Sequence, residues 1–260
     1  MPVPPPSYPE GRNLLVGKTV LVTAAAGTGI GFAVAKRCAE EGARVMISDI
    51  HERRLGEAAE KLAAATGAKV PTQLCNVTKQ EDVDALWAAA ERELGGVDVL
   101  MNNAGLGGEV ALVDMTDEQW HGVLDVTLNG TFRMTRAGLR HMQPRGAGAI
   151  VNNASVLGWR AQKGQAHYAA AKAGVMALTR CAAVEAADHG VRVNCVAPSI
   201  ALHPFLVKTS NQELIDRLQE REAFGRAAEP WEVANVMVFL ASDLSSYMTG
   251  EVVSVSSQHA

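Results

Sequence analysis

Hydrophobic positions along the chain alternate between short β-branched runs and longer segments with a helical period. The short runs predict strands at residues 19–23, 44–48, 69–74, 97–101, 149–153, 191–196 and 252–255. The segments between them predict helices at residues 32–41, 52–65, 79–94, 116–142, 165–187, 211–223 and 230–240. Strands and helices that alternate at this spacing form parallel sheets with right-handed crossovers. We therefore expect a single Rossmann-like α/β fold, a doubly wound parallel sheet of about seven strands with helices on both faces.

The chain divides into a short arm and one large unit. Residues 1–12 are rich in proline and predict a flexible N-terminal arm. The 260 residues are 48% hydrophobic and 20% charged, which suits one large α/β domain. Because no internal repeat or linker is visible, we expect residues 13–260 to form a single domain.

Charge and cysteine content narrow the range of partners. A formal net charge of −4 leaves no basic surplus, so no nucleic-acid partner is expected. Four cysteines without a CxxC pair predict a reducing compartment, with neither a disulfide framework nor a metal site. No window resembles a transmembrane helix or a signal peptide, so we expect no membrane association and a cytoplasmic location.

A glycine turn, residues 27–31, lies between the first predicted strand and the first helix. Backbone N–H groups at such a helix N-terminus can bind a pyrophosphate. Asp49 ends the second strand, where its carboxylate can accept hydrogen bonds from ribose hydroxyls and would repel a 2′-phosphate. No Arg or Lys lies in the turn, which favours NAD over NADP as the cofactor. The other interpretation of Asp49 is a cap for the helix that begins at Glu52.

Tyr168 and Lys172 are four residues apart in an alanine-rich segment that favours helix, so they share one face. A charge at about 4 Å is worth up to ~4 kcal/mol at a dielectric of ~20, or ~3 pKa units. Lys172 can thus bring the Tyr168 phenol toward the range of a general acid/base. Ser155 follows the fifth strand, at the sheet edge where ligands bind. Each residue alone also fits an ordinary surface or capping role, and no GxSxG elbow supports a hydrolase.

Taken together, these motifs resemble the short-chain dehydrogenase/reductase family over nearly the whole chain. The matching positions, in order, are Gly29-Ile30-Gly31, Asp49, Asn103-Ala104-Gly105, Ser155, Tyr168-xxx-Lys172, Pro198 and the tail from Phe239 through Thr249-Gly250. The resemblance implies hydride transfer at the nicotinamide C4 of NAD. Tyr168 would be the acid/base, Ser155 would orient the substrate oxygen, and Lys172 would bind the nicotinamide ribose and lower the tyrosine pKa.

The resemblance also implies a set of cofactor contacts and an assembly. The implied contacts are Thr23, Gly27, Thr28, Gly29, Ile30, Asp49, Ile50, Asn76, Val77, Asn103, Ala104, Gly105, Tyr168, Lys172, Pro198 and Ala201. Asn76, where the family often has Asp, would bond to the adenine edge. In the family, the helices expected here at residues 116–142 and 165–187 pair across a two-fold axis, which implies a homotetramer.

The chain departs from the family pattern at several positions. The glycine turn is one residue longer, and residues 24–26, all alanine, stand where its first glycine is expected. Gly27 is expected to supply the lost flexibility. Pro198-Ser199 replaces the usual Pro-Gly, residues 256–258 replace the usual Asp-Gly-Gly, and His203 aligns with the threonine that touches the carboxamide.

Thr127 stands where the family usually has a catalytic Asn. Asn129 lies two residues further on, about 200° around a helix, so it should not substitute directly. The backbone carbonyl of Thr127 can still hold the water of a proton relay. Its hydroxyl can bond to the carbonyl one turn back and distort the helix. We therefore count Thr127 among the catalytic residues and expect only small effects from Thr127→Asn and Thr127→Val.

Several expected pocket residues indicate a bulky, apolar small-molecule substrate. The candidates are Leu106, Leu157, Trp159, His203 and Phe205. Arg160, Lys163 and Lys208 could bind a carboxylate or a CoA phosphate, or form a solvated rim. Residues 152–162 and 223–233 resemble actinobacterial family members that act on CoA thioesters of the two-ring steroid remnant. The leading hypothesis is an NAD-dependent oxidoreductase for a bulky secondary alcohol or ketone. The alternatives are a 3-oxoacyl-carrier-protein reductase and a non-catalytic dinucleotide sensor.

Overall fold

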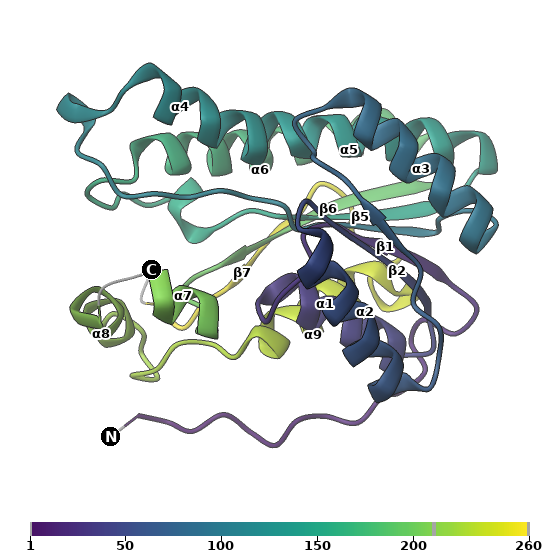
Figure 1. The fold of residues 1–260 in the computed structure, drawn as a ribbon, viewed down its shortest axis with the longest axis horizontal. Helices are drawn as coiled ribbons and strands as arrows, with labels where there is room; N and C mark the ends of the chain where they lie inside the picture. Colours follow the sequence, from purple (N-terminus) through teal and green to yellow (C-terminus); the bar gives the residue numbers. More distant parts are fainter. Residues whose placement is uncertain (1, 210–211, 259–260) are drawn as a thin grey trace.

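A seven-stranded parallel sheet forms the centre of the molecule (Figure 1). The computed structural model describes residues 2–209 and 212–258. The strands are β1 (Thr19–Val22), β2 (Arg44–Asp49), β3 (Thr72–Leu74), β4 (Val99–Asn102), β5 (Gly148–Asn153), β6 (Val191–Pro198) and β7 (Val252–Val255). Their order in the sheet is β3-β2-β1-β4-β5-β6-β7. The strand order reverses between β1 and β4, which creates the crevice where ligands bind in such folds. The predicted fold class is confirmed.

Helices cover both faces of the sheet, as Figure 1 shows. One face carries α1 (Ile30–Glu40), α2 (Glu52–Thr66) and α9 (Pro230–Ala241). The other carries α3 (Gln80–Leu94), α4 (Asp117–Leu124), α5 (Gly130–Met142) and α6 (Ala166–Ala187). Alternate residues of β1 point to the two faces: Val20 and Val22 join the first core, and Leu21 joins the second. Strands buried on both faces explain the uninterrupted apolar runs in the sequence.

Three predicted elements differ from the structure. The helix predicted at residues 116–142 is divided into α4 and α5 by a π-helical turn, Asp125–Asn129. Strand β3 begins at Thr72 instead of residue 69, because the preceding Pro71 has no N–H to donate to the sheet. After β6 comes α7 (Pro204–Thr209), which the sequence pattern did not predict, and then α8 (Gln212–Glu220). None of the described helices is both long and apolar enough to cross a membrane.

The N-terminal segment contacts the domain at several points in this structure, and the flexibility of residues 1–12 remains a prediction. The Tyr8 hydroxyl donates to Glu40 Oε2 at 2.6 Å, and the Tyr8 ring contacts the Trp231 ring edge-on, with centroids 5.5 Å apart. The backbone N–H of Val3 donates to Phe224 O at 2.8 Å. These contacts join the segment to α1, to α9 and to the loop after α8. Composition alone could not reveal them, because the partners lie far away in the sequence.

Candidate active site

The glycine turn after β1 leaves its backbone open toward the crevice. Helix α1 begins at Ile30 without a side-chain cap, so its first N–H groups are available to an anion. A methyl group added at Gly31 would lie 2.3 Å from Ala24 O, so only glycine fits there. Ala24 has a φ of 51°, and Gly27 has a φ of 146°. Ala24 therefore adopts a left-handed conformation itself, at the place where the family has its first glycine. The expectation that Gly27 alone supplies the flexibility is incomplete.

The Asp49 carboxylate lies at the carboxyl end of β2, beside the glycine turn. Its two oxygens accept hydrogen bonds from the backbone N–H of Ala26 at 3.1 Å and of His51 at 3.0 Å. Burial raises the pKa of Asp49, while the Ala26 N–H and the charge of Arg54 act in the opposite direction. The N-cap of α2 is His51, which makes no side-chain cap bond. The interpretation of Asp49 as a cap of that helix is therefore not supported, and the carboxylate faces the turn.

Thr23 joins the ends of β1 and β4 at the point where the strand order reverses. Its hydroxyl accepts hydrogen bonds from the backbone N–H of Asn103 at 3.0 Å and of Ala104 at 3.2 Å. The Asn103 side chain in turn donates to Ala24 O at 3.1 Å. These bonds hold the glycine turn against the Asn-Ala-Gly segment. Two motifs about 80 residues apart in the sequence thus form one side of the crevice.

Four further predicted cofactor residues lie at or just after the carboxyl ends of β3 and β6. The Asn76 side-chain oxygen accepts from Thr78 N at 3.1 Å and Thr78 Oγ1 at 2.8 Å, so its amide NH₂ is the group left for an adenine edge. Val77 is buried, and a methyl group added at Gly130 would lie 2.6 Å from its Cγ2. Pro198 ends β6, and Ala201 forms a bridge with Ala228. Cofactor contacts at these positions remain predictions.

Ser155 and Tyr168 lie side by side at the carboxyl edge of β5. Ser155 Oγ accepts from Leu157 N at 3.2 Å and donates to Pro198 O at 3.5 Å. Tyr168 stands in the first turn of α6. Burial raises the pKa of Tyr168 to about 12, and a hydrogen bond with Ser155 partly opposes this. The pair thus presents two hydroxyl groups that can bond to one substrate oxygen.

Lys172 is buried below Tyr168, with its side chain only 3% exposed. Its Nζ donates to the backbone oxygen of Asn153 at 2.6 Å and lies 5.5 Å from the centroid of the Tyr168 ring. Burial lowers the pKa of Lys172 to about 8. Burial therefore outweighs any lowering of the Tyr168 pKa by the lysine charge in this structure, and the role of Lys172 in lowering it remains a prediction. Burial destabilises the charged form of both groups, so the lysine pKa falls and the phenol pKa rises.

Thr127 occupies the π-helical turn between α4 and α5 and is fully buried. Its hydroxyl accepts from Leu106 N at 2.9 Å and donates to Leu106 O at 3.0 Å. The hydroxyl of Thr131 donates to Thr127 O at 2.8 Å. The expected bond from Thr127 to the carbonyl one turn back is therefore wrong. The side chain reaches across to the loop after β4 instead, and it is Thr131 that bonds back onto Thr127.

The loop after β4 covers the buried polar groups. A methyl group added at Gly105 would lie 3.4 Å from Lys172 Nζ, and one added at Gly107 would lie 3.6 Å from the Tyr168 ring. Sequence reasoning missed His167, which is buried and accepts a hydrogen bond from the Tyr168 N–H at 2.9 Å through Nδ1. Burial lowers the pKa of His167. Its place directly before the tyrosine was the only available signal.

The predicted substrate residues are less closely gathered than the catalytic ones. Leu106 and Trp159 are 46% and 52% exposed. Leu157 follows Ser155 in a short 3₁₀ turn, residues 156–158. A methyl group added at Gly29 would lie 3.5 Å from the His203 ring, so His203 stands over the glycine turn, and its contact with the carboxamide remains a prediction. Phe205 falls in α7, and its side chain lies outside the described part of the chain.

Two of the three expected cations can be placed. Arg160 donates to the Gln258 side chain, so it fastens the C-terminal segment. Lys163 lies in the loop before α6 and is exposed. The side chain of Lys208 lies outside the described part of the chain.

The residues present fit a nicotinamide dinucleotide. The start of α1 offers uncapped N–H groups, Gly31 leaves no room for a side chain under the turn, and the Asp49 carboxylate stands at the end of β2. Ser155, Tyr168 and Lys172 meet at the other end of the crevice. The arrangement can bind a dinucleotide and exchange a proton with a substrate oxygen.

Comparison with known proteins agrees with this geometry. The model of a family described as enoyl-(acyl carrier protein) reductase matches residues 24–257. The chain is 62% identical over 256 residues to a Mycobacterium tuberculosis protein named (5R,7aS)-5-hydroxy-7a-methyl-1-oxo-2,3,5,6,7,7a-hexahydro-1H-indene-carboxyl-CoA reductase. The match covers 98% of this chain and 97% of that protein.

Two further comparisons concern a more distant relative and a solved structure. A 3-oxoacyl-[acyl-carrier-protein] reductase of Chlamydia muridarum is 38% identical over 244 residues, which are 94% of this chain and 98% of that protein. A crystal structure of a short chain dehydrogenase from Mycobacterium smegmatis has a TM-score of 0.88 at 58% identity, with 98% of both chains covered.

Proposed function

The chain belongs to the short-chain dehydrogenase/reductase family of oxidoreductases, and we propose that it uses NADH to reduce the ketone of a bulky fused-ring CoA thioester. The substrate class rests on one observation, the 62% identity to the mycobacterial indene-carboxyl-CoA reductase over nearly all of both chains. The 38% identity to the carrier-protein reductase supports the alternative substrate less well. A non-catalytic sensor would have no use for the joined Ser155, Tyr168 and Lys172.

NADH is the proposed donor because of Asp49. Its carboxylate is held at the end of β2 by the Ala26 and His51 N–H groups, where an adenosine ribose would lie. Ribose hydroxyls can donate to this carboxylate, whereas a 2′-phosphate would be repelled. Burial raises the pKa of Asp49, whereas the charge of Arg54 acts to lower it and so favours the ionised carboxylate.

The chain's own residues supply the proton and the orientation. When bound, the dinucleotide supplies the hydride that reaches the carbonyl carbon. Ser155 then donates a hydrogen bond to the ketone oxygen, and Tyr168 transfers its phenolic proton to that oxygen as the alcohol forms. The Lys172 ammonium, held on Asn153 O, lies close enough to stabilise the tyrosinate that remains.

Two measurements test this proposal. Dissociation constants of NADH and NADPH at one ionic strength should differ at least about tenfold in favour of NADH. Equal or tighter NADPH binding would overturn the cofactor assignment. Turnover of a bicyclic ketone presented as its CoA thioester should exceed turnover of a 3-oxoacyl group on carrier protein. The reverse preference would favour the carrier-protein reductase.

We also propose a homotetramer that pairs α5 and α6 with their copies. Phe132 on α5 is 42% exposed and Val184 on α6 is 78% exposed, so both helices carry apolar side chains on the surface. In an isologous contact, both side chains would be buried on each of the two protomers. Sedimentation of the full chain at micromolar concentration should give four protomers, and a stable monomer would overturn this.

A further inference from the structure

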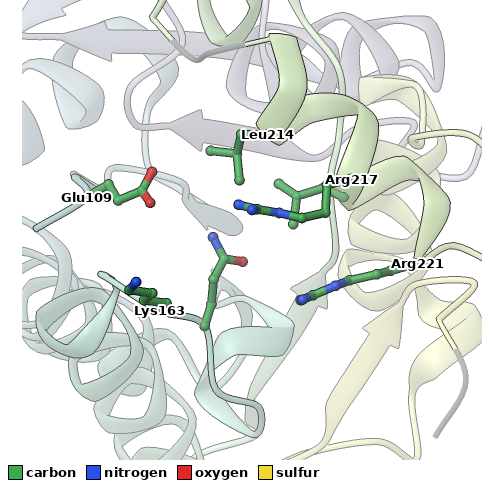
Figure 2. A pocket seen from close by; sticks show the side chains of 7 residues that line it. Glu109, Lys163, Leu214, Arg217 and Arg221 are labelled. Carbon is green, nitrogen blue, oxygen red and sulfur yellow. The ribbon is translucent and has the colours of Figure 1, made fainter. Parts of the chain in front are cut away.

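A solvent-open cavity of about 310 Å³ lies between α8 and the loop before α6. Its lining residues are Glu109, Gln162, Lys163, Leu214, Arg217, Leu218 and Arg221. Figure 2 shows Arg217 on α8, and Arg221 directly after it, extending toward Lys163 and Glu109 on the opposite wall. The cavity thus separates α8 from the loop that leads into α6.

The cavity is positively charged in a chain whose formal net charge is −4. Lys163, Arg217 and Arg221 carry three positive charges against the single carboxylate of Glu109. Among residues 2–209 and 212–258, none of these three cations forms an ion pair within 4.0 Å. By contrast, Arg226, just after α8, is paired with Glu232 at 2.6 Å. Unpaired cations around a concave surface are suited to an anion.

A short segment connects this cavity to the catalytic tyrosine. A methyl group added at Gly107 would lie 3.6 Å from the Tyr168 ring, and Glu109 two residues later lines the cavity. Consecutive Cα atoms are about 3.8 Å apart, so the two positions are separated by at most about 8 Å. The Val110 N–H donates to Gly164 O at 3.0 Å, which holds this segment against the cavity wall. A long substrate with its ketone at Tyr168 can therefore extend its other end into the cavity.

We propose that this cavity binds the phosphate groups of the CoA moiety, with the thioester arm lying along residues 107–109. The assignment rests on the proposed function for the identity of the acyl group. Arginine presents a planar fork that binds phosphate oxygens with two parallel hydrogen bonds, and the cavity holds two such forks with a lysine opposite. A concave, solvent-open volume of about 310 Å³ suits a phosphorylated small molecule better than the convex surface of a carrier protein.

Binding of free CoA to the full chain loaded with NADH tests the site directly. Arg217→Gln and Arg221→Gln should each weaken CoA binding about tenfold, because each removes a charge-assisted phosphate contact. Glu109→Gln should tighten CoA binding several-fold, since it removes the one opposing charge. Arg92→Gln changes an exposed arginine on α3, which lies far from α8 in Figure 1, and this charge control should change nothing. NADH affinity should stay constant throughout.

The outcomes separate this inference from the proposed function. The bicyclic substrate could be turned over equally fast as its CoA thioester and as its N-acetylcysteamine thioester, with no effect of Arg217→Gln or Arg221→Gln. That result would overturn the CoA site in the cavity and keep the proposed function. CoA binding that follows the charge series, without turnover of any bicyclic thioester, would keep the cavity and overturn the function. If the two arginine variants impair only an acyl carrier protein substrate, the cavity serves that protein and the inference is wrong. No effect of Glu109→Gln in either assay would also contradict it.

Discussion

Among the described residues, two tyrosine–lysine pairs are in contact, and they differ in distance, burial and hydrogen-bond partners. In the surface pair, Lys36 Nζ lies 4.2 Å from the centroid of the Tyr8 ring and donates to its hydroxyl at 3.0 Å. In the buried pair, Lys172 Nζ lies 5.5 Å from the Tyr168 ring. Distance alone would therefore select the surface pair as the better acid/base unit.

The environments reverse that ranking. Glu40 holds Lys36 at 2.5 Å, and hydrogen bonds to Glu40 and Tyr8 raise the lysine pKa although burial opposes them. The surface lysine thus stays charged and bonded to Glu40 and Tyr8. Burial instead lowers the pKa of Lys172 to about 8, and within the described part of the chain its ammonium donates to a backbone carbonyl, which stays neutral. Only the buried pair has a proton equilibrium close to neutral pH.

The comparison indicates that burial and a hydrogen bond to a neutral carbonyl, more than a short distance, bring the lysine pKa of such a pair close to neutral pH. A carboxylate partner would form an ion pair with the lysine and neutralise its charge. The Asn153 oxygen fixes the position of Lys172 and leaves its charge available to a tyrosinate above it. The predictions below test whether the two pairs differ in function as they differ in environment.

The largest effect is expected from Tyr168→Phe. Removal of the phenol should lower kcat by at least about 100-fold, the usual contribution of a general acid. NADH binding should change little, since the hydroxyl serves proton transfer. Single-turnover and steady-state rates with the CoA thioester measure this. A variant that keeps more than about a tenth of the wild-type kcat would remove Tyr168 from the proton-transfer role.

A pH dependence set by Lys172 comes next. Its charge is lost as pH rises through about 8, while Tyr168 keeps its proton up to about 12, so kcat/KM for reduction should fall about tenfold per pH unit above 8. The contribution of Lys172 to the free energy of unfolding should instead increase with pH. Between about 8 and the ordinary value of 10.5 the unfolded lysine binds more proton than the folded one, so folding is favoured as pH rises.

Lys172→Met separates these two effects. The variant lacks the titrating group, so its stability relative to wild type should decrease as pH rises from about 8 to 10. Chemical denaturation at several pH values measures this difference. A kcat/KM that is flat to pH 10 in the wild type would contradict the assignment.

Thr127 should show a smaller effect. Thr127→Val removes the hydroxyl that bonds to both Leu106 N and Leu106 O, so the loop over Lys172 loses its anchor. We expect kcat/KM to fall about tenfold, in contrast to the small change expected from the sequence. Thr127→Ser keeps the hydroxyl and is the matched control, with activity near wild type. Equal activity of the Val and Ser variants would show that the side chain is dispensable.

Elements set by local pattern were predictable from the sequence. The seven strands and most helices followed from apolar runs that are buried on both sheet faces, as with Val20, Leu21 and Val22. Features set by contacts between distant segments were not. Thr127 in the π-helical turn bonds to Leu106, and Tyr8 in the N-terminal segment contacts Trp231, and neither partner is a sequence neighbour.

The site divides in the same way. The sequence placed Ser155, Tyr168 and Lys172 together because strand ends and helix spacing bring such residues to one edge. It could not reveal that the pKa of Tyr168 is raised, since burial by the surrounding fold outweighs a charge at this distance. The sequence also could not show that the His203 ring lies beside Gly29, because the two residues are more than 170 positions apart in the chain.

The smallest effect is expected at the surface pair, from Tyr8→Phe. The change removes the hydroxyl that bonds to Glu40 and Lys36 but keeps the ring against Trp231. Tyr8 is 40% exposed, so water replaces these bonds and the loss of stability should be below about 1 kcal/mol, or a Tm decrease of at most about 4 °C. The kcat should equal that of the wild type, because no described contact joins Tyr8 to the crevice. Tyr8→Ala, which also removes the ring contact, should cost more stability with the same unchanged kcat. A loss of turnover in either variant would show that the surface pair communicates with the active site, and the distinction between the two pairs would fail.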